Sequence, residues 1–169
     1  MMEIFEKHKV GFVYLFECFD KNGKLKWREK IGNIIPDIGL DYLLEAALAG
    51  ATRYAAWHIG ISETAYAPLA GDDMATLLAA APECKKYSGT TRKALTADSV
   101  ASGLWSNAGT PAEFTFTSSA SVKVGFISSS NVWDNTTGLL VSAVQFPSPR
   151  SVVTTDVLRV IAGIQLISA

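Results

Sequence analysis

Residues 113–127, with the sequence EFTFTSSASVKVGFI, decide the fold of this chain. Two Phe residues alternate with two Thr residues over positions 114–117, so one side of this segment is apolar and the other is polar. After a short Ser-rich break, residues 122–127 are again rich in Val, Phe and Ile. β-branched and aromatic residues closed off by Ser predict two β-strands joined by a turn.

The same composition recurs on both sides of this stretch. The further predicted strands are residues 10–19, 24–28, 55–61, 92–96, 139–146 and 157–167. Asn22-Gly23 separates the first two of these and is a strong hairpin signal, because both residues tolerate positive φ. About eight short strands with Gly, Asn and Ser turns predict a mainly β fold, a jelly-roll-like β-sandwich.

One amphipathic helix is predicted over residues 38–49. Asp37 is placed to cap it and Gly50 to end it. The apolar residues recur at the helical period and are expected to face a sheet, with Asp41 and Glu45 on the solvent side. These apolar residues are Leu40, Leu43, Leu44, Ala47 and Leu48. A second short helix, residues 74–81, is predicted after Asp72-Asp73 and before Pro82.

The 169 residues form a single predicted domain, residues 10–169, preceded by an N-terminal arm, residues 1–9. Apolar residues make up 49% of the chain and charged residues 18%, which is a globular composition with surplus apolar surface. A net charge of −1 does not favour nucleic acid as a partner, and no apolar run is long enough to span a membrane. The arm lacks the apolar core of a signal peptide, so synthesis in the cytoplasm is expected, with Cys18 and Cys84 as unpaired buried residues.

The sequence offers no catalytic signature. G-x-S-x-G, P-loop and H-E-x-x-H motifs do not occur, so we expect no enzyme activity, no catalytic residues and no cofactor. His58 has no acid or nucleophile at a motif spacing and is interpreted as a structural or surface residue. Asp72 and Asp73 are interpreted as a helix start and not as a metal site, so no metal is expected either.

Seven apolar residues are candidates for an interface. Ile4 and Phe5 lie near the tip of the arm, which either clasps a neighbouring subunit or is a frayed terminus. The segment 10–19 is apolar on both of its faces and is therefore either sandwiched between layers or part of an interface. The seven candidates are Ile4, Phe5, Phe12, Tyr14, Phe16, Trp105 and Trp133.

Several segments together resemble a family of small structural proteins of tailed bacteriophages. The resemblance covers roughly residues 25–167 and is carried by motifs of the fold. These are Lys26-Trp27-Arg28-Glu29 with Asn33 and Gly39-Leu40, Trp57-His58-Ile59-Gly60-Ile61, Phe114-Thr115-Phe116-Thr117 with Val124-Gly125-Phe126-Ile127, and Gly138-Leu139-Leu140 with Phe146, Pro147, Ser148, Arg150 and Asp156-Val157-Leu158. Residues 1–9 and 62–86 depart from the pattern.

The resemblance implies a virion protein, either a capsid decoration (cement) protein or a small part of the neck, tail or fibre. The preferred expectation is a cement protein that binds the major capsid protein, is a homo-oligomer, and stabilises the assembled head. A tail or fibre receptor-binding module would use exposed aromatics, with Trp105 and Trp133 as candidates. A carbohydrate-binding jelly roll is a third alternative, suggested by the tryptophans, although no paired acids occur at a readable spacing.

Overall fold

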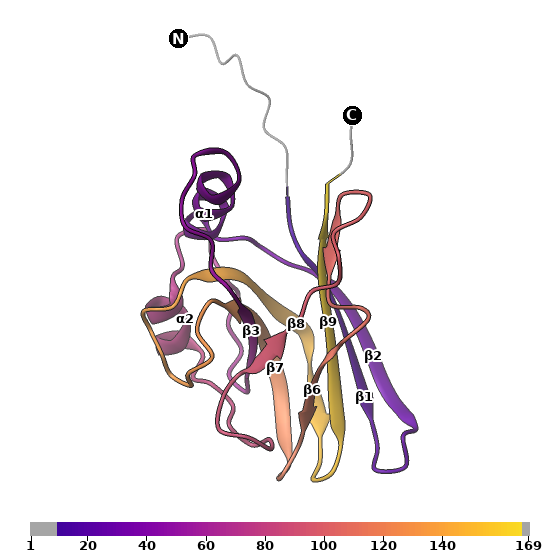
Figure 1. Ribbon diagram of the computed structural model, residues 1–169. Helices are drawn as coiled ribbons and strands as arrows, with labels where there is room; N and C mark the ends of the chain where they lie inside the picture. The colour runs from indigo at the N-terminus through magenta and orange to yellow at the C-terminus, as the bar shows by residue number, and fades with distance from the viewer. Residues whose placement is uncertain (1–9, 167–169) are drawn as a thin grey trace.

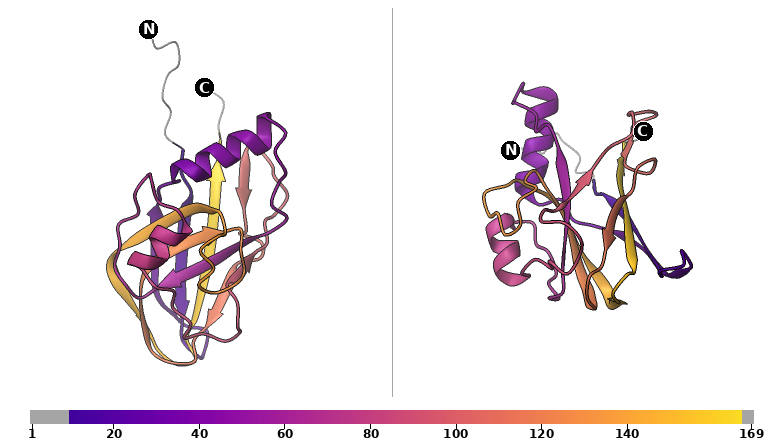
Figure 2. Two further views of the ribbon diagram at one scale, coloured as in Figure 1. Left: turned by 90° about the vertical axis from the view of Figure 1, so that its left-hand side faces the viewer. Right: turned by 60° about the horizontal axis from the view of Figure 1, so that its bottom comes forward.

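The computed structural model describes residues 10–166, so the predictions for Ile4 and Phe5 lie outside the described residues. The described chain has two antiparallel sheets that pack face to face as a β-sandwich, with two helices (Figures 1 and 2). The predicted mainly β class is therefore confirmed, and the jelly-roll-like topology stays a prediction. The elements are β1 (Val13–Phe19), β2 (Leu25–Gly32), α1 (Asp37–Leu48), β3 (Trp57–Ser62), α2 (Met74–Ala80), β4 (Lys93–Leu95), β5 (Leu104–Ser106), β6 (Ala112–Thr115), β7 (Ala120–Ser128), β8 (Leu140–Val152) and β9 (Val157–Gln165).

The first sheet has the order β2-β1-β9, and both β5 and β6 pair with the free side of β9. The second sheet has the order β4-β3-β7-β8. Trp27 of β2 donates a hydrogen bond from Nε1 to the carbonyl of Ser151 in β8 at 3.0 Å, and Arg150 pairs with Glu29 beside it. These contacts join the two sheets along one side of the sandwich.

The space between the sheets is filled by aromatic and branched side chains. Tyr14 and Phe16 from β1 are fully buried there, with Phe114 from the stretch that decides the fold. The structure thus corrects the prediction that Tyr14 and Phe16 are interface residues, because both side chains are 0% exposed. Phe12, one residue before β1, is 4% exposed and cannot form an outer contact surface, although it lines a pocket described below. The opposite face of β1 points outward, where Val13 is 44% exposed.

The two helices occupy different places. α2 packs Met74, Leu77 and Leu78 on the outer face of β7 and β8. Its N-cap is Asp73, whose carboxylate accepts a hydrogen bond from the Thr76 amide at 2.8 Å, as the predicted helix start requires. α1 lies across one end of the sandwich (Figure 2). Gly39, which has no side chain, lets the helix approach β8 closely, because a Cβ at this position would lie 3.1 Å from the Leu140 carbonyl oxygen.

The predicted buried face of α1 is confirmed for Leu43 and wrong for Leu40, Leu44, Ala47 and Leu48. Gly39, Tyr42, Leu43 and Ala46 face the sandwich, whereas the side chains of Leu40, Leu44 and Leu48 face outward and are 36%, 60% and 82% exposed. The N-cap position is Pro36, so Asp37 lies in the first turn and makes no capping hydrogen bond. The helix is therefore where the pattern places it, but it is rotated about its axis by roughly a third of a turn.

Candidate functional site

The candidate site lies at the end of the sandwich covered by α1. We call this the α1 end; it comprises α1, the connection 49–56, the start of β1, the end of β9 and β5. Both ends of the described chain lie here, while the β1–β2 and β8–β9 turns lie at the opposite end (Figure 1). Two features of the α1 end distinguish it: an apolar pocket under the helix, and an exposed apolar stripe on the helix.

The pocket has a volume of about 350 Å³ and opens between α1 and the ends of the two sheets. A site of this size is in the range of ligand and side-chain binding pockets. Its walls are almost entirely apolar or aromatic, with Arg53 as the charged member. The lining residues are Phe12, Tyr42, Leu43, Ala46, Ala47, Arg53, Tyr54, Trp57, Trp105, Val141 and Ile164.

Aromatic rings build two walls of the pocket. Tyr42, Tyr54 and Trp57 form a triangle whose ring centroids are 5.2 to 5.7 Å apart. The Tyr42 hydroxyl accepts a hydrogen bond from the Tyr54 amide at 2.8 Å, which fixes the 49–56 connection against the helix. Phe12 and Trp105 meet edge to face at 5.8 Å and form the other wall. Such pairs hold their rings in fixed positions, so the pocket is preformed.

A neighbouring hollow extends the pocket toward the edge strand β4. It has a volume of about 370 Å³ and shares Tyr54, Trp57 and Trp105 with the pocket.

The apolar stripe is the row Leu40, Leu44 and Leu48 on the outer side of α1. Asp37, Asp41 and Glu45, all exposed, form a parallel row beside it, and the helix contains no Lys or Arg. Residues four apart lie on one helix face, so the two rows run side by side. The surface suits a partner whose apolar patch is bordered by basic side chains.

Of the two tryptophans predicted as interface candidates, only Trp105 lies at the α1 end. Trp133 is half-buried against the core elsewhere, and its Nε1 donates to the Tyr87 hydroxyl at 2.7 Å. The structure does not bring the two together. Tyr42 and Tyr54 were not predicted as site residues. The sequence holds one signal for them: the two tyrosines lie on either side of the predicted helix end at Gly50, and Tyr54 is three residues before Trp57.

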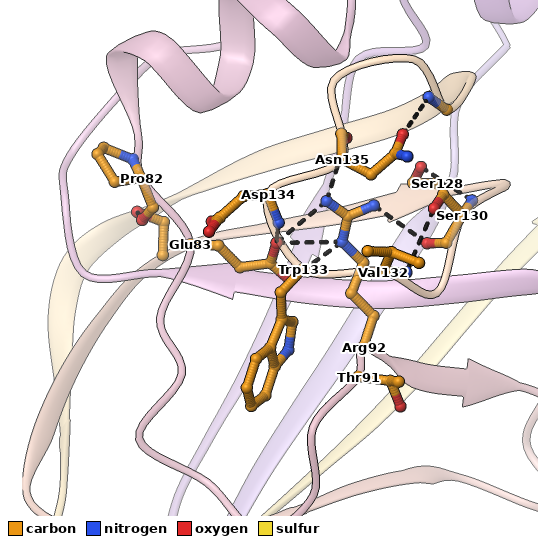
Figure 3. Close-up of polar contacts among 12 residues, drawn as sticks. Pro82, Glu83, Thr91, Arg92, Ser128, Ser130, Val132, Trp133, Asp134 and Asn135 are labelled. Atoms are coloured by element: carbon orange, nitrogen blue, oxygen red, sulfur yellow. Dashed lines mark hydrogen bonds and ion pairs between the residues drawn. The ribbon is translucent and has the colours of Figure 1, made fainter.

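A buried ion pair, Arg92 and Glu83, fixes the loop that carries Trp133 (Figure 3). Both side chains are 0% exposed, and two guanidinium nitrogens of Arg92 lie 3.0 Å from the Glu83 carboxylate oxygens. Arg92 also donates to the Ser130 carbonyl at 3.0 Å, and Glu83 accepts from the Asp134 amide at 3.1 Å. Because both charged groups have their hydrogen-bonding partners inside the fold, we interpret the pair as structural.

Asp72 is a further buried polar group with partners inside the fold, whereas the buried Nδ1 of His58 has no hydrogen-bond partner among the described residues. The Asp72 carboxylate accepts from the Tyr66 hydroxyl at 2.9 Å and from the Leu69 amide at 2.8 Å. His58 has a pKa lowered by burial and by the nearby Arg92 charge. Over residues 10–166 no group of three or more His, Cys, Asp or Glu side chains could hold a metal ion, and no helix there could cross a membrane.

In comparisons with protein families and with curated proteins, this sequence matched no family and no curated relative.

Proposed function

We propose that this chain is a structural protein of a tailed-bacteriophage virion, a decoration (cement) protein that binds the major capsid protein of the assembled head. The resemblance of its fold motifs to small phage structural proteins suggests the class of protein. The observation that carries the proposal is the exposed Leu40-Leu44-Leu48 stripe at the α1 end. A contiguous apolar row on a rigid helix is typical of a protein–protein contact surface.

The chemistry of the stripe describes the partner surface. Burying apolar area contributes about 25 cal/mol per Å², so three leucines at the centre of a contact provide a substantial part of its free energy. The acidic row beside them favours a capsid surface that is apolar at the centre and basic at the rim. An interface of standard size, about 1,600 Å², suffices when many copies decorate one shell.

The test is to add the purified protein to phage heads that lack it and to measure occupancy and heat resistance of the shells. We expect saturable binding and a higher temperature of shell disruption. Leu44→Ser with Leu48→Ser should reduce occupancy strongly. Leu25→Ser is the matched control, because Leu25 is 40% exposed beside the β1–β2 turn at the opposite end of the molecule.

Salt provides a second measurement on the same samples. Asp41→Asn with Glu45→Gln should weaken binding at low ionic strength and remove much of its salt dependence, since exposed charges are screened by salt. If the protein never binds heads but sediments with isolated tails, the cement proposal is wrong and a tail or neck protein takes its place.

A further inference from the structure

The pocket under α1 opens beside the place where the described chain begins. Phe12, one residue before β1, forms part of its wall, and Val10 is the first described residue. Among the nine residues that precede Val10, the apolar pair Ile4-Phe5 stands between the acids Glu3 and Glu6. The pocket offers the complementary surface, aromatic and aliphatic walls with the Arg53 guanidinium among them.

We propose that this pocket receives the Ile4-Phe5 segment of a second copy of the chain. Phe5 would lie among the rings of Tyr42, Tyr54 and Trp57, where an aromatic side chain gains both burial and edge contacts. Arg53, which is exposed, would pair with Glu3 or Glu6. The inference rests on the proposed role as an assembly protein and names the site of self-association.

The direction of the chain at its first described residues favours a second copy over the same one. The Phe12 amide donates to the side-chain oxygen of Asn33, and the Asn33 amide donates to the Phe12 carbonyl at 3.1 Å. Residue 12 is therefore fixed beside Asn33. A return of Phe5 into its own pocket needs a chain reversal between residues 5 and 11. Residues 5–10 contain none of the Gly, Pro, Asn, Asp or Ser residues that favour turns, and Gly11 does not have the positive φ of a tight turn.

The length of the segment sets the geometry of the assembly. Phe12 follows Phe5 by seven positions, and an extended chain spans at most about 3.3–3.6 Å per residue. The pocket of the neighbouring copy must therefore lie within about 25 Å of this chain's Phe12. Adjacent copies on a shell would be linked through the α1 end.

The experiment uses the full-length chain carrying Phe5→Ser, which leaves the pocket free, and a synthetic peptide with the sequence of residues 1–9. Fluorescence of Trp57 and Trp105 in the pocket wall reports binding. We expect saturable binding of the wild-type peptide, and at least about tenfold weaker binding of a peptide with Phe5→Ser, because one buried Phe is lost. No binding of the wild-type peptide contradicts the proposal.

Exchanging charges between Arg53 and the peptide tests how the segment is oriented in the pocket. Arg53 is exposed, so its substitution should not affect folding. Arg53→Glu, added to the Phe5→Ser chain, should weaken binding of the wild-type peptide. A peptide with Glu3→Lys and Glu6→Lys should bind this variant better than the wild-type peptide does. Absence of that recovery contradicts the placement of the segment.

Sedimentation of the wild-type protein distinguishes a segment bound in its own pocket from a segment bound in the pocket of a second copy. We expect concentration-dependent association of the wild-type protein, loss of association in Phe5→Ser, and normal association in the Leu25→Ser control. A wild-type protein that stays monomeric and no longer binds added peptide would show that the segment occupies its own pocket, which overturns the proposal. These measurements need no shells, so their outcome is independent of the capsid-binding test.

Discussion

Arg92 shows how a single residue organises a long loop in this fold. Its side chain is fully buried, stacks over the Phe126 ring at 5.2 Å, and holds both Glu83 and the backbone of residues 130–135. Removing a charged group from water costs free energy, and the ion pair with its additional hydrogen bonds offsets that cost only while both partners are present. The conformation of residues 130–135 therefore depends on the Arg92–Glu83 pair.

We predict that Arg92→Met lowers the free energy of unfolding by about 3–5 kcal/mol, because it leaves the Glu83 carboxylate buried without a partner. Urea denaturation followed by tryptophan fluorescence measures the change. Arg159→Met is the matched control: its pair with Glu113 is 40% and 49% exposed, so the loss should stay below about 1 kcal/mol. Equal losses in the two variants would contradict the structural role given to Arg92.

The two cysteines give a second prediction at the residue scale. Cys18 and Cys84 are unpaired and buried, as the sequence predicted. Burial, with a contribution from the Asp156 carboxylate, raises the pKa of Cys18 to about 12, and burial also raises the pKa of Cys84. Both thiols stay protonated at mildly alkaline pH, and the thiolate is the reactive form.

We therefore expect iodoacetamide to modify neither cysteine of the native protein at mildly alkaline pH, and both after denaturation without reductant. Intact-mass measurement counts the modified thiols. Rapid modification of one cysteine in the native state would show that its surroundings open, and an unmodified denatured chain would show a disulfide.

Among the elements, α1 shows most clearly what the sequence could and could not predict. Its bounds follow from the apolar period and from Gly50, which has a positive φ of 76° just beyond the helix end. Its buried face does not follow, because apolar residues occur on almost every side of it. Which face of α1 is buried depends on its close contact with β8, which requires Gly39 and favours Ala46. It also depends on the inward position of the Tyr42 ring.

The orientation of α1 predicts different effects for adjacent leucines. Leu43 packs against the core and Leu44 points outward. We expect Leu43→Ala to lower the free energy of unfolding by about 1–3 kcal/mol, and Leu44→Ala to change it by no more than about 0.5 kcal/mol. Urea midpoints of the two variants provide the comparison; a larger loss in Leu44→Ala would restore the helix face expected from the sequence.

Strands were predicted correctly where the local sequence signals, such as turn residues, agree with the strand pairing that the fold adopts. The β1–β2 turn forms at Asn22-Gly23, where Gly23 has a φ of 77° and the Asp20 carboxylate accepts from the Asn22 amide at 2.8 Å. β8 extends past Phe146 through two prolines, against expectation, because the residues after Phe146 fall in an irregularity of the pairing with β7. β5 was missed because its three residues lie within residues 99–110, whose Ser, Asn and Gly content is typical of an irregular connection.

The candidate site was less predictable than the fold for a physical reason. Its residues come from α1, the 49–56 connection and four strands, and only the packing of the two sheets brings them together. Burial of Tyr14 and Phe16 removed two of the interface candidates, since the same apolar pattern serves a core and a contact surface, and Phe12 is reached only as part of the pocket wall. Trp105 lines the pocket because β5 pairs with the end of β9.

The whole molecule divides into a scaffold and the α1 end, which we propose as the contact surface. The opposite end carries the β1–β2 and β8–β9 turns, and one face of the second sheet is covered by α2. The α1 end combines an exposed apolar stripe with an apolar pocket. Both ends of the described chain also lie there (Figure 1). A protein of this design can attach to a surface through the helix and reach a neighbour through its first residues.

Hydrogen exchange of the protein free and bound to phage heads tests this account most directly. We predict that binding slows amide exchange in peptides from the 36–56 region and around β5, and leaves exchange unchanged in the β1–β2 turn at residues 20–24 and the β8–β9 turn at residues 153–156. Protection at those two turns, with unchanged exchange across α1, would contradict the assignment of the α1 end as the contact surface.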